Sequence, residues 1–285
     1  MKCKLIVNRE SGNFEKLNID ALLCNLGCDA AVEVIDSKSQ WSAEGFDTVI
    51  VCGGDGTLNN AVQKCRGKRL IYVPCGTFNE TAATSNKLER LAQVNGTPFS
   101  YVCATGSFTE IGYTAANCDK KRWKKLAYMP QVLKNYRCHE IFARLTADGK
   151  NFDGTYTLIM VLKSHRCFGF SFNKDYKTTK KNYLVAVKSV GKDSFLNRVK
   201  MFFPFFRIFF CGAKPCVKSQ WLLIPFDKLT LQTEKPQYFC VDGEKRKLSG
   251  VLHFSELTID PPIEVVLPPK SGRREHAFER TLHAD

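Results

Sequence analysis

The chain has 285 residues, a formal net charge of +14 and thirteen cysteines. Its charged fraction of 25% and apolar fraction of 44% are typical of a globular protein with a substantial core, and they exclude a disordered chain. The positive charge favours nucleic acid, an anionic membrane surface or phosphorylated substrates, without choosing among them.

The cysteines are odd in number, lie in apolar segments and form no paired CxxC units. This pattern predicts buried thiols in a reducing compartment rather than a disulfide or zinc framework. The chain starts directly with a short strand, without the apolar region of a signal peptide, and contains no stretch of membrane-spanning length. We therefore expect a cytoplasmic protein.

Apolar runs alternate with helix-compatible segments in the first quarter of the chain. Strands are predicted at residues 5–7, 31–35, 48–52 and 70–73, and helices at residues 19–26 and 58–65. Strands that alternate with helices indicate a parallel sheet with ligand-binding loops at the carboxyl ends of the strands. The loops at 8–13, 53–57 and 74–80 should therefore share one edge of the sheet.

The loop after the third strand is rich in glycine and carries one carboxylate. Gly53, Gly54 and Gly56 allow a sharp turn, and the N–H groups that begin the next helix can face an anion. Asp55 would repel a phosphate unless a cation or a bound hydroxyl lay between them, so it indicates magnesium or a reacting group. Asp-Gly is also a common hairpin signal, but a hairpin needs a second strand where this chain has a helix.

The fourth strand leads into Pro74-Cys75-Gly76-Thr77-Phe78-Asn79-Glu80. Thr77, with Glu80 three residues later, forms a capping-box pattern and predicts a helix after this loop. A capped helix terminus still presents N–H groups to a ligand, so capping and ligand binding are compatible.

From Glu140 onward the apolar period changes to two. Ile141, Ala143 and Leu145 alternate with polar residues, and Asp148-Gly149 is a hairpin signal. Further strands are predicted at residues 155–163, 183–187, 221–225, 238–241, 251–254 and 257–259. This half should form an antiparallel β-sandwich.

Residues 195–210 are unusually aromatic and are interleaved with Arg198, Lys200 and Arg207. Packing in the core under a sheet is one interpretation. The other is an interfacial membrane-docking segment, whose aromatic rings enter the headgroup boundary while its cations meet anionic lipid. The segment cannot span a bilayer, because Pro204 and Arg207 interrupt it. A nucleic-acid partner is not expected, because the aromatic residues concentrate in one apolar block.

Four motifs, in this order, resemble the diacylglycerol kinase catalytic-domain family, which includes soluble bacterial diacylglycerol kinases and the sphingosine and ceramide kinases. The motifs are Asn8-Arg9-Glu10-Ser11-Gly12, Gly53-Gly54-Asp55-Gly56-Thr57, Pro74-Cys75-Gly76-Thr77-Phe78-Asn79 and Asp242-Gly243-Glu244. NAD kinases and phosphofructokinases carry similar glycine-aspartate loops, but the third motif at this spacing separates the lipid kinases from them. Arg9 replaces the family's proline, and Phe78 and Glu80 stand where the family often has glycine and aspartate.

The pattern and the resemblance together predict an α/β fold with two domains. Residues 1–115, with 262–285, would form a three-layer α/β/α parallel-sheet domain that binds ATP. Residues 116–261 would form an antiparallel β-sandwich that binds lipid. As in the family, residues 263–267 would return the chain to the first domain.

The resemblance also implies ATP and Mg²⁺ as cofactors and assigns residues to them. The residues that would hold ATP are Asn8, Arg9, Ser11, Gly12, Gly53, Gly54, Asp55, Gly56, Thr57, Asn59 and Thr77. Asp55, with Mg²⁺, would orient the phosphates, and Asn79 and Glu80 would line the cleft near the acceptor. Glu244 would take the proton from the lipid hydroxyl, a role that partial burial would favour. The alternative for Asp242-Gly243 is a plain hairpin turn.

One departure from the family concerns metal binding. Bacterial members have an Asp-Asp-Gly turn that organises a structural magnesium, whereas Lys180 and Lys181 occupy the acidic positions here. Ammonium groups cannot hold magnesium, so this second metal site is predicted to be absent. We expect a lysine ammonium to replace the cation and to bond the same carbonyls or carboxylates.

The prediction is thus an ATP-dependent lipid kinase, with diacylglycerol as the leading acceptor, that associates peripherally with an anionic membrane. One rival is a degenerate member that binds ATP or anionic lipid without catalysis. Another is a kinase for a different lipid alcohol, such as a sphingoid base. The sequence leaves the oligomeric state open, with a homodimer among the alternatives.

Overall fold

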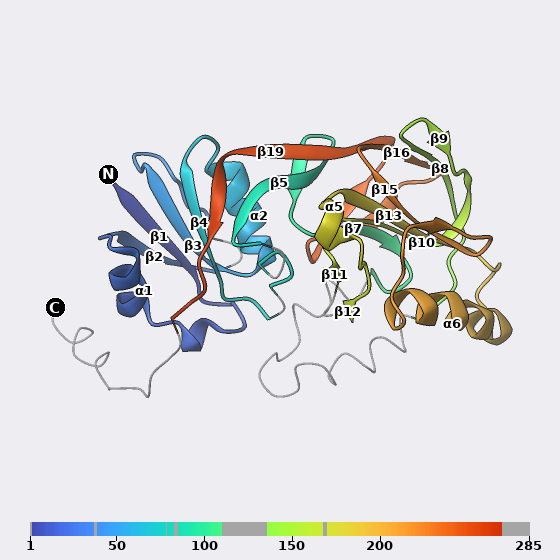
Figure 1. The fold of residues 1–285 in the computed structure, drawn as a ribbon, viewed down its shortest axis with the longest axis horizontal. Helices are drawn as coiled ribbons and strands as arrows, with labels where there is room; N and C mark the ends of the chain where they lie inside the picture. The colour runs from blue at the N-terminus through green and yellow to red at the C-terminus, as the bar shows by residue number, and fades with distance from the viewer. Residues whose placement is uncertain are drawn as a thin grey trace.

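Four parallel strands form the centre of the N-terminal part of the molecule (Figure 1). The computed structural model describes residues 2–36, 39–77, 79–82, 85–109, 136–167 and 170–269. The strands are β1 (Cys3–Asn8), β2 (Ala31–Ile35), β3 (Thr48–Gly53) and β4 (Arg69–Pro74). Their spatial order is β2-β1-β3-β4, and every residue of β3 is buried. An unbroken apolar run suits a strand that is covered on both faces.

Helices lie on both faces of this sheet, which gives three layers. Leu22 of α1 (Ile19–Leu26) packs in one cluster with Val7 and Ile50. Leu58 of α2 (Asp55–Lys64) packs in another cluster with Val51. Successive strand residues point to opposite faces, so each helix takes alternate residues of the same strands. A short 3₁₀ turn (Phe14–Lys16) precedes α1.

Antiparallel strands form the second half of the molecule. The strands are β5 (Lys87–Val94), β6 (Thr97–Phe99), β7 (Val102–Gly106), β8 (Ile141–Ala147), β9 (Lys150–Asn151), β10 (Gly154–Leu162), β11 (Arg166–Cys167), β12 (Phe170–Ser171), β13 (Asn182–Lys188), β14 (Cys216–Val217), β15 (Trp221–Phe226), β16 (Lys228–Thr233), β17 (Gln237–Val241), β18 (Glu244–Leu248) and β19 (Val251–Val265). In β8, buried residues alternate with exposed ones, as a half-buried strand requires. The inner faces enclose one cluster that includes Leu145, Tyr156 and Phe254.

A second apolar cluster lies between the sheet and helix α6 (Phe195–Phe209). The helix contributes Met201, Phe205 and Ile208, whose spacing of four and three residues places them on one face. Ser194 caps its N-terminus by accepting a hydrogen bond from the Asn197 N–H at 3.3 Å. The only other helix described in this half is α5 (Tyr176–Thr179). No helix in the described ranges combines the length and hydropathy needed to cross a bilayer.

Strand β19 links the two halves (Figure 1). Its first residues pair with β16, its middle pairs with β5, and Glu264 and Val265 pair in parallel with β4. Strand β7, which lies within residues 1–115, pairs with β10 and β17 of the second half. The strand pairing of the second half thus begins before the expected boundary near residue 115.

Candidate functional site

The three loops expected at one edge lie together at the carboxyl ends of β1, β3 and β4. The Asn8 side chain donates to Thr57 Oγ1 at 2.9 Å, which joins the first loop to the second. The Asn13 N–H donates to the Cys75 carbonyl at 2.9 Å, and the Cys75 N–H donates to the Gly53 carbonyl at 2.7 Å. Each loop is therefore bonded to at least one of the other two.

Close approach of another loop explains two of the glycines. A Cβ on Gly76 would lie 2.7 Å from Gly54 Cα, and a Cβ on Gly12 would lie 2.4 Å from Thr77 Oγ1. Atoms cannot approach so closely, and a backbone atom has little room to move. Only glycine at position 76 therefore allows the second and third loops to touch.

The N-terminus of α2 is open at this edge. Its N-cap is Gly54, which has no side chain to accept a hydrogen bond from the first turn. Helix N-terminal N–H groups without a cap are suited to an anion, and the helix dipole adds to the attraction. The glycine loop therefore presents the geometry that a phosphate requires.

Asp55 is buried and holds the third loop. Its two carboxylate oxygens accept from the backbone N–H groups of Glu80 at 2.9 Å and Thr81 at 3.2 Å. Burial raises the pKa of Asp55, and the hydrogen bonds from Thr81 and Glu80 oppose this shift. Its predicted role toward the phosphates stays a prediction, because in the structure it is bonded to the turn.

The helix expected after Thr77 is wrong for the described residues, which form a turn at 80–82. In a capping box, the Thr77 side chain would accept from the Glu80 N–H. That N–H donates to Asp55 instead. Asp55 of α2 therefore accepts the hydrogen bond from the N–H group that the predicted cap requires.

Asn79 and Glu80 are also engaged within the protein. Asn79 has a φ of 46°, and its side chain bonds both the N–H and the carbonyl of Gly76 at 2.7 and 3.0 Å. Glu80 is buried and forms an ion pair with Arg166 of β11 at 3.4 Å. Glu80 thus ties the third loop to the second half, a contact that sequence reasoning missed because Arg166 carries no motif.

The remaining predicted ATP ligands differ in their surroundings. Arg9 is exposed and pairs with Asp36 at 3.4 Å. Ser11 Oγ and Asn59 Oδ1 are buried, and neither has a hydrogen-bond partner within the described part of the chain. A buried polar atom without a partner is costly, so both atoms are suited to a ligand or a water molecule.

The turn between β17 and β18 packs against the start of α2. A Cβ on Gly56 would lie 3.9 Å from the Asp242 carbonyl oxygen. The Asp242 side chain accepts from the Ser100 hydroxyl at 2.8 Å and from the N–H groups of Tyr101 and Val102 at 3.0 Å each. The structure thus brings the C-terminal motif to the glycine loop.

Asp242 is a residue to which sequence reasoning gave no role. Burial raises its pKa to about 6, against the opposing effect of the N–H and hydroxyl donors. Its φ of 48° is suited to a turn residue. The signal for its role was present in the Asp-Gly pair, but the donors that surround its side chain lie about 140 residues earlier.

Glu244, the predicted general base, is exposed at the start of β18. Its carboxylate accepts from Arg246 at 2.8 Å. The partial burial that would favour this role is not present in the structure. Its place beside the Asp242 turn agrees with the motif, and its role stays a prediction.

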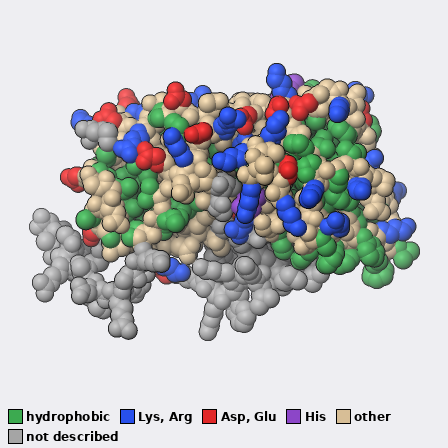
Figure 2. Space-filling view, in the orientation of Figure 1, with side chains coloured by type: hydrophobic (Ala, Val, Ile, Leu, Met, Phe, Trp, Pro, Cys, Tyr) green, Lys and Arg blue, Asp and Glu red, His purple; other side chains and the backbone are tan. Residues whose placement is uncertain are grey.

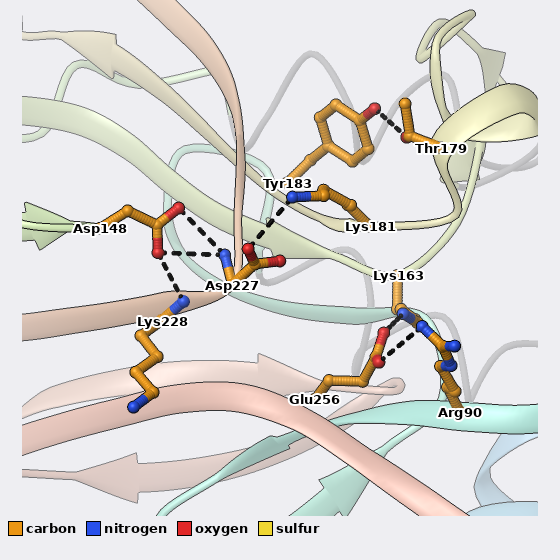
Figure 3. Close-up of polar contacts among 9 residues, drawn as sticks. All are labelled: Arg90, Asp148, Lys163, Thr179, Lys181, Tyr183, Asp227, Lys228 and Glu256. Atoms are coloured by element: carbon orange, nitrogen blue, oxygen red, sulfur yellow. Dashed lines mark hydrogen bonds and ion pairs between the residues drawn. The ribbon is translucent and has the colours of Figure 1, made fainter.

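A buried lysine ammonium, that of Lys163, lies beside Glu256 (Figure 3), and its replacement of a metal stays a prediction. Its Nζ, which is almost fully buried, donates to the Lys180 carbonyl at 2.8 Å and to Glu256 at 2.6 Å. Burial lowers the pKa of Lys163, and the bond to Glu256 opposes this shift. Lys181, expected in this role, instead pairs with Asp227 at the surface at 3.1 Å.

The oxygen atoms at this site are suited to a magnesium ion that would bind together with phosphates. Within the described ranges, no three His, Cys, Asp or Glu side chains are placed to hold a metal. Asp55 and Asn59, one helical turn apart, offer buried oxygen atoms. Mg²⁺ commonly takes one or two carboxylates together with substrate phosphates, so this oxygen set is suited to it.

A comparison with known protein families gives a match in the N-terminal part of the chain. The family model described as diacylglycerol kinase catalytic domain matches residues 2–95. Residues 2–95 are therefore similar to the diacylglycerol kinase catalytic-domain family. This span contains the first three motifs, and the predicted family resemblance is confirmed.

Two curated relatives extend the match. A diacylglycerol kinase of Bacillus subtilis (strain 168) is 29% identical over 150 residues, which cover 44% of this chain and 49% of the relative. The chain thus aligns with about half the length of that kinase. A protein of Streptococcus pneumoniae serotype 4, provisionally named a lipid kinase, is 22% identical over 216 residues, or 64% of this chain and 72% of that protein.

A solved structure supports the fold. A Bacillus anthracis str. Sterne protein, provisionally named a diacylglycerol kinase, has a TM-score of 0.67 at 19% identity, covering 92% of this chain and 96% of its own. The predicted fold class, with a parallel α/β part and an antiparallel part, is confirmed.

Replacement of Gly76 by Ala tests the packing of the loops. The new Cβ would meet Gly54 Cα, so Gly76→Ala should lower the free energy of unfolding by about 1–3 kcal/mol. Gly154→Ala is the matched control, because its Cβ would lie 3.7 Å from Tyr156 and should cost less than about 0.5 kcal/mol. Urea unfolding measures both, and equal losses would contradict the packing argument.

Replacement of Lys163 by Met tests how much its buried ammonium group stabilises the protein. It removes the Lys163 donor from the Lys180 carbonyl and one of the two cations bonded to Glu256, so stability should fall by about 2–3 kcal/mol. Lys181→Met breaks only an exposed ion pair and should cost less than about 1 kcal/mol. Thermal unfolding measures the stability of both variants. A larger loss of stability in Lys181→Met than in Lys163→Met would contradict the stabilising role of the Lys163 ammonium.

Proposed function

We propose that the chain is an ATP-dependent lipid kinase that transfers the γ-phosphate of ATP to a lipid hydroxyl, with diacylglycerol as the first candidate acceptor. The observation that carries this proposal is the meeting of three loops and a carboxylate-bearing turn at the N-terminus of α2. The Asp242 carbonyl oxygen lies 3.9 Å from the position that a Cβ on Gly56 would take. The turn that carries the C-terminal motif therefore lies against the loop that would bind phosphate. The similarity to kinases supports the same reaction class.

On the phosphate side, the backbone of the glycine loop would bind ATP. The N–H groups of the first turn of α2 lack a capping side chain and would bind the phosphates. Ser11, whose buried hydroxyl has no partner among the described residues, and Thr77, packed against Gly12, would contact ATP from the flanking loops. Mg²⁺ bound with ATP would neutralise phosphate charge, and Asp55 and Asn59 would hold it.

On the acceptor side, Glu244 would act as general base. It would take the proton of the lipid hydroxyl while that oxygen bonds to the γ-phosphorus and the bond to ADP breaks. For this step its bond to Arg246 must yield to the substrate. Asp242 would act only as a positioning residue, since its side chain is fully occupied by backbone and hydroxyl donors.

Most of the rate enhancement would come from positioning. The loops are joined by hydrogen bonds, so the phosphate site would not need to reorganise when ATP binds. Glu80 and Asn79 support this arrangement by fixing the third loop, although the resemblance places them near the acceptor.

A second candidate is a member that binds ATP or anionic lipid without catalysis. The specific observation in its favour is that Glu244 is exposed and bonded to Arg246, so this carboxylate is not prepared for proton transfer. Both oxygens of Asp55 are likewise bonded to backbone N–H groups.

The test is phosphate transfer from labelled ATP into mixed micelles that contain diacylglycerol, sphingosine or a polyprenol. We expect label in diacylglycerol and a rate reduced roughly 100-fold or more in Glu244→Gln. Glu234→Gln, an exposed glutamate away from the site, is the matched control and should keep the wild-type rate. Asp55→Asn should also lose transfer, with unfolding measured to confirm that it is folded.

The outcomes separate the candidates. Label in sphingosine or the polyprenol alone would keep the kinase and change the acceptor. No label in any lipid, with ATP still bound in calorimetry, would establish the binding protein in its place.

A further inference from the structure

Helix α6 is apolar on two faces. The inner face, through Met201, Phe205 and Ile208, packs against the sheet. The outer face carries exposed aromatic rings, which we call the aromatic face: Phe195, Phe202, Phe203, Phe206 and Phe210. One helix face suffices to bury the helix on the domain, so the outer rings need another explanation.

The aromatic face is an ordered row of rings. Phe206 stacks on Phe202 at 5.5 Å and on Phe210 at 5.4 Å, measured between ring centroids. Phe170 of β12 extends the row and lies 5.2 Å from Phe210. Even so, Phe203 is 66% and Phe195 is 80% exposed. Figure 2 shows hydrophobic side chains gathered at the lower right, where Figure 1 places α6.

The charge around this face is mostly positive, and Asp193, just before the helix, pairs with Arg198. Five basic residues and no acidic residue occur between Asp193 and Asp227. The five are Arg198, Lys200, Arg207, Lys214 and Lys218. Cations that flank an apolar surface complement an anionic lipid headgroup layer, and each adds to the attraction near that layer.

The geometry of α6 fits a position in the membrane interface. Its 15 residues correspond to roughly 22 Å of helix, which is shorter than the hydrocarbon core of a bilayer. Arg198, Lys200 and Arg207 lie on the helix itself, so it cannot be placed in the hydrocarbon. Aromatic rings are favourable at the boundary between headgroups and acyl chains.

A second copy of the chain fits this face less well. In a two-fold dimer through α6, the basic residues of one copy would face those of the other, with no acidic residue in the segment to pair with them. An anionic bilayer gives burial for the rings and counter-charge for the cations.

We propose that the aromatic face of α6 is a docking surface for an anionic lipid bilayer. The rings enter the headgroup boundary, and the flanking cations meet the phosphate groups of the lipids. This inference goes beyond the proposed kinase activity, because it holds whether or not the chain transfers phosphate.

The test is co-sedimentation of the full chain with vesicles of phosphatidylcholine, with or without roughly a third phosphatidylglycerol. We expect binding to the anionic vesicles and a partition coefficient reduced roughly tenfold or more in the double variant Phe203→Ser, Phe206→Ser. Phe142→Ser is the matched control: Phe142 lies on β8 and is 44% exposed, the same fraction as Phe206. This control should bind as the wild type does.

Each further result decides the proposal. Weaker binding in Lys200→Glu and in high salt would support the role of the cations. Failure of the wild type to bind anionic vesicles, or equal binding by the double variant, would overturn it. A dimer in light scattering that the double variant dissociates would also overturn it, in favour of a second copy on this face. Loss of phosphate transfer alone, with vesicle binding kept, would count against the kinase and leave the docking surface intact.

Discussion

A buried carboxylate, that of Asp242, connects the two halves of the candidate site. A carboxylate without water must find donors within the protein, and Asp242 finds them on Ser100, Tyr101 and Val102 at the entry to β7. These bonds fix the turn whose carbonyl lies against Gly56. The place of the Asp242 turn beside the glycine loop therefore depends on contacts made about 140 residues earlier in the chain.

Asp55 in the first half is likewise a buried carboxylate that accepts hydrogen bonds from backbone N–H groups. Its oxygens hold the N–H groups of Glu80 and Thr81, and Glu80 in turn reaches Arg166 in the second half. Asp55-Gly56 begins a helix and Asp242-Gly243 forms a hairpin, so an identical dipeptide serves two structures. The segment that follows decides between them: Leu58 gives an apolar helix face, whereas residues 244–248 extend as a strand.

The layers and the convergence of the loops could be predicted because they depend on local pattern. Unbroken apolar runs marked β1, β3 and β4, and parallel strands place their carboxyl ends together. Strand β5 carried no such signal, since Leu88, Leu91 and Ala92 have helical spacing, and it is a strand because it pairs with β19 and β6. Tertiary pairing has overridden the local pattern.

Polar contacts between segments that are distant along the chain could not be predicted from the sequence. Lys163 lies in no motif, and only the fold brings it to the Lys180 carbonyl and Glu256. The exposure of Glu244 and the loss of the cap at Thr77 have the same cause, because each depends on a partner fixed by tertiary structure. The aromatic composition of α6 could be read from the sequence. Which of its residues are buried and which are exposed depends on how the helix packs on the sheet.

The central claim is that ATP binds where the three loops meet. Hydrogen–deuterium exchange with and without ATP and Mg²⁺ tests it most directly, because it reports on the backbone N–H groups that would bind the phosphates. We predict slower exchange in the presence of ATP at residues 8–13, 53–57 and 74–77, with no change at α6. Unchanged exchange at all three loops under saturating ATP, or protection confined to another part of the chain, would contradict the account.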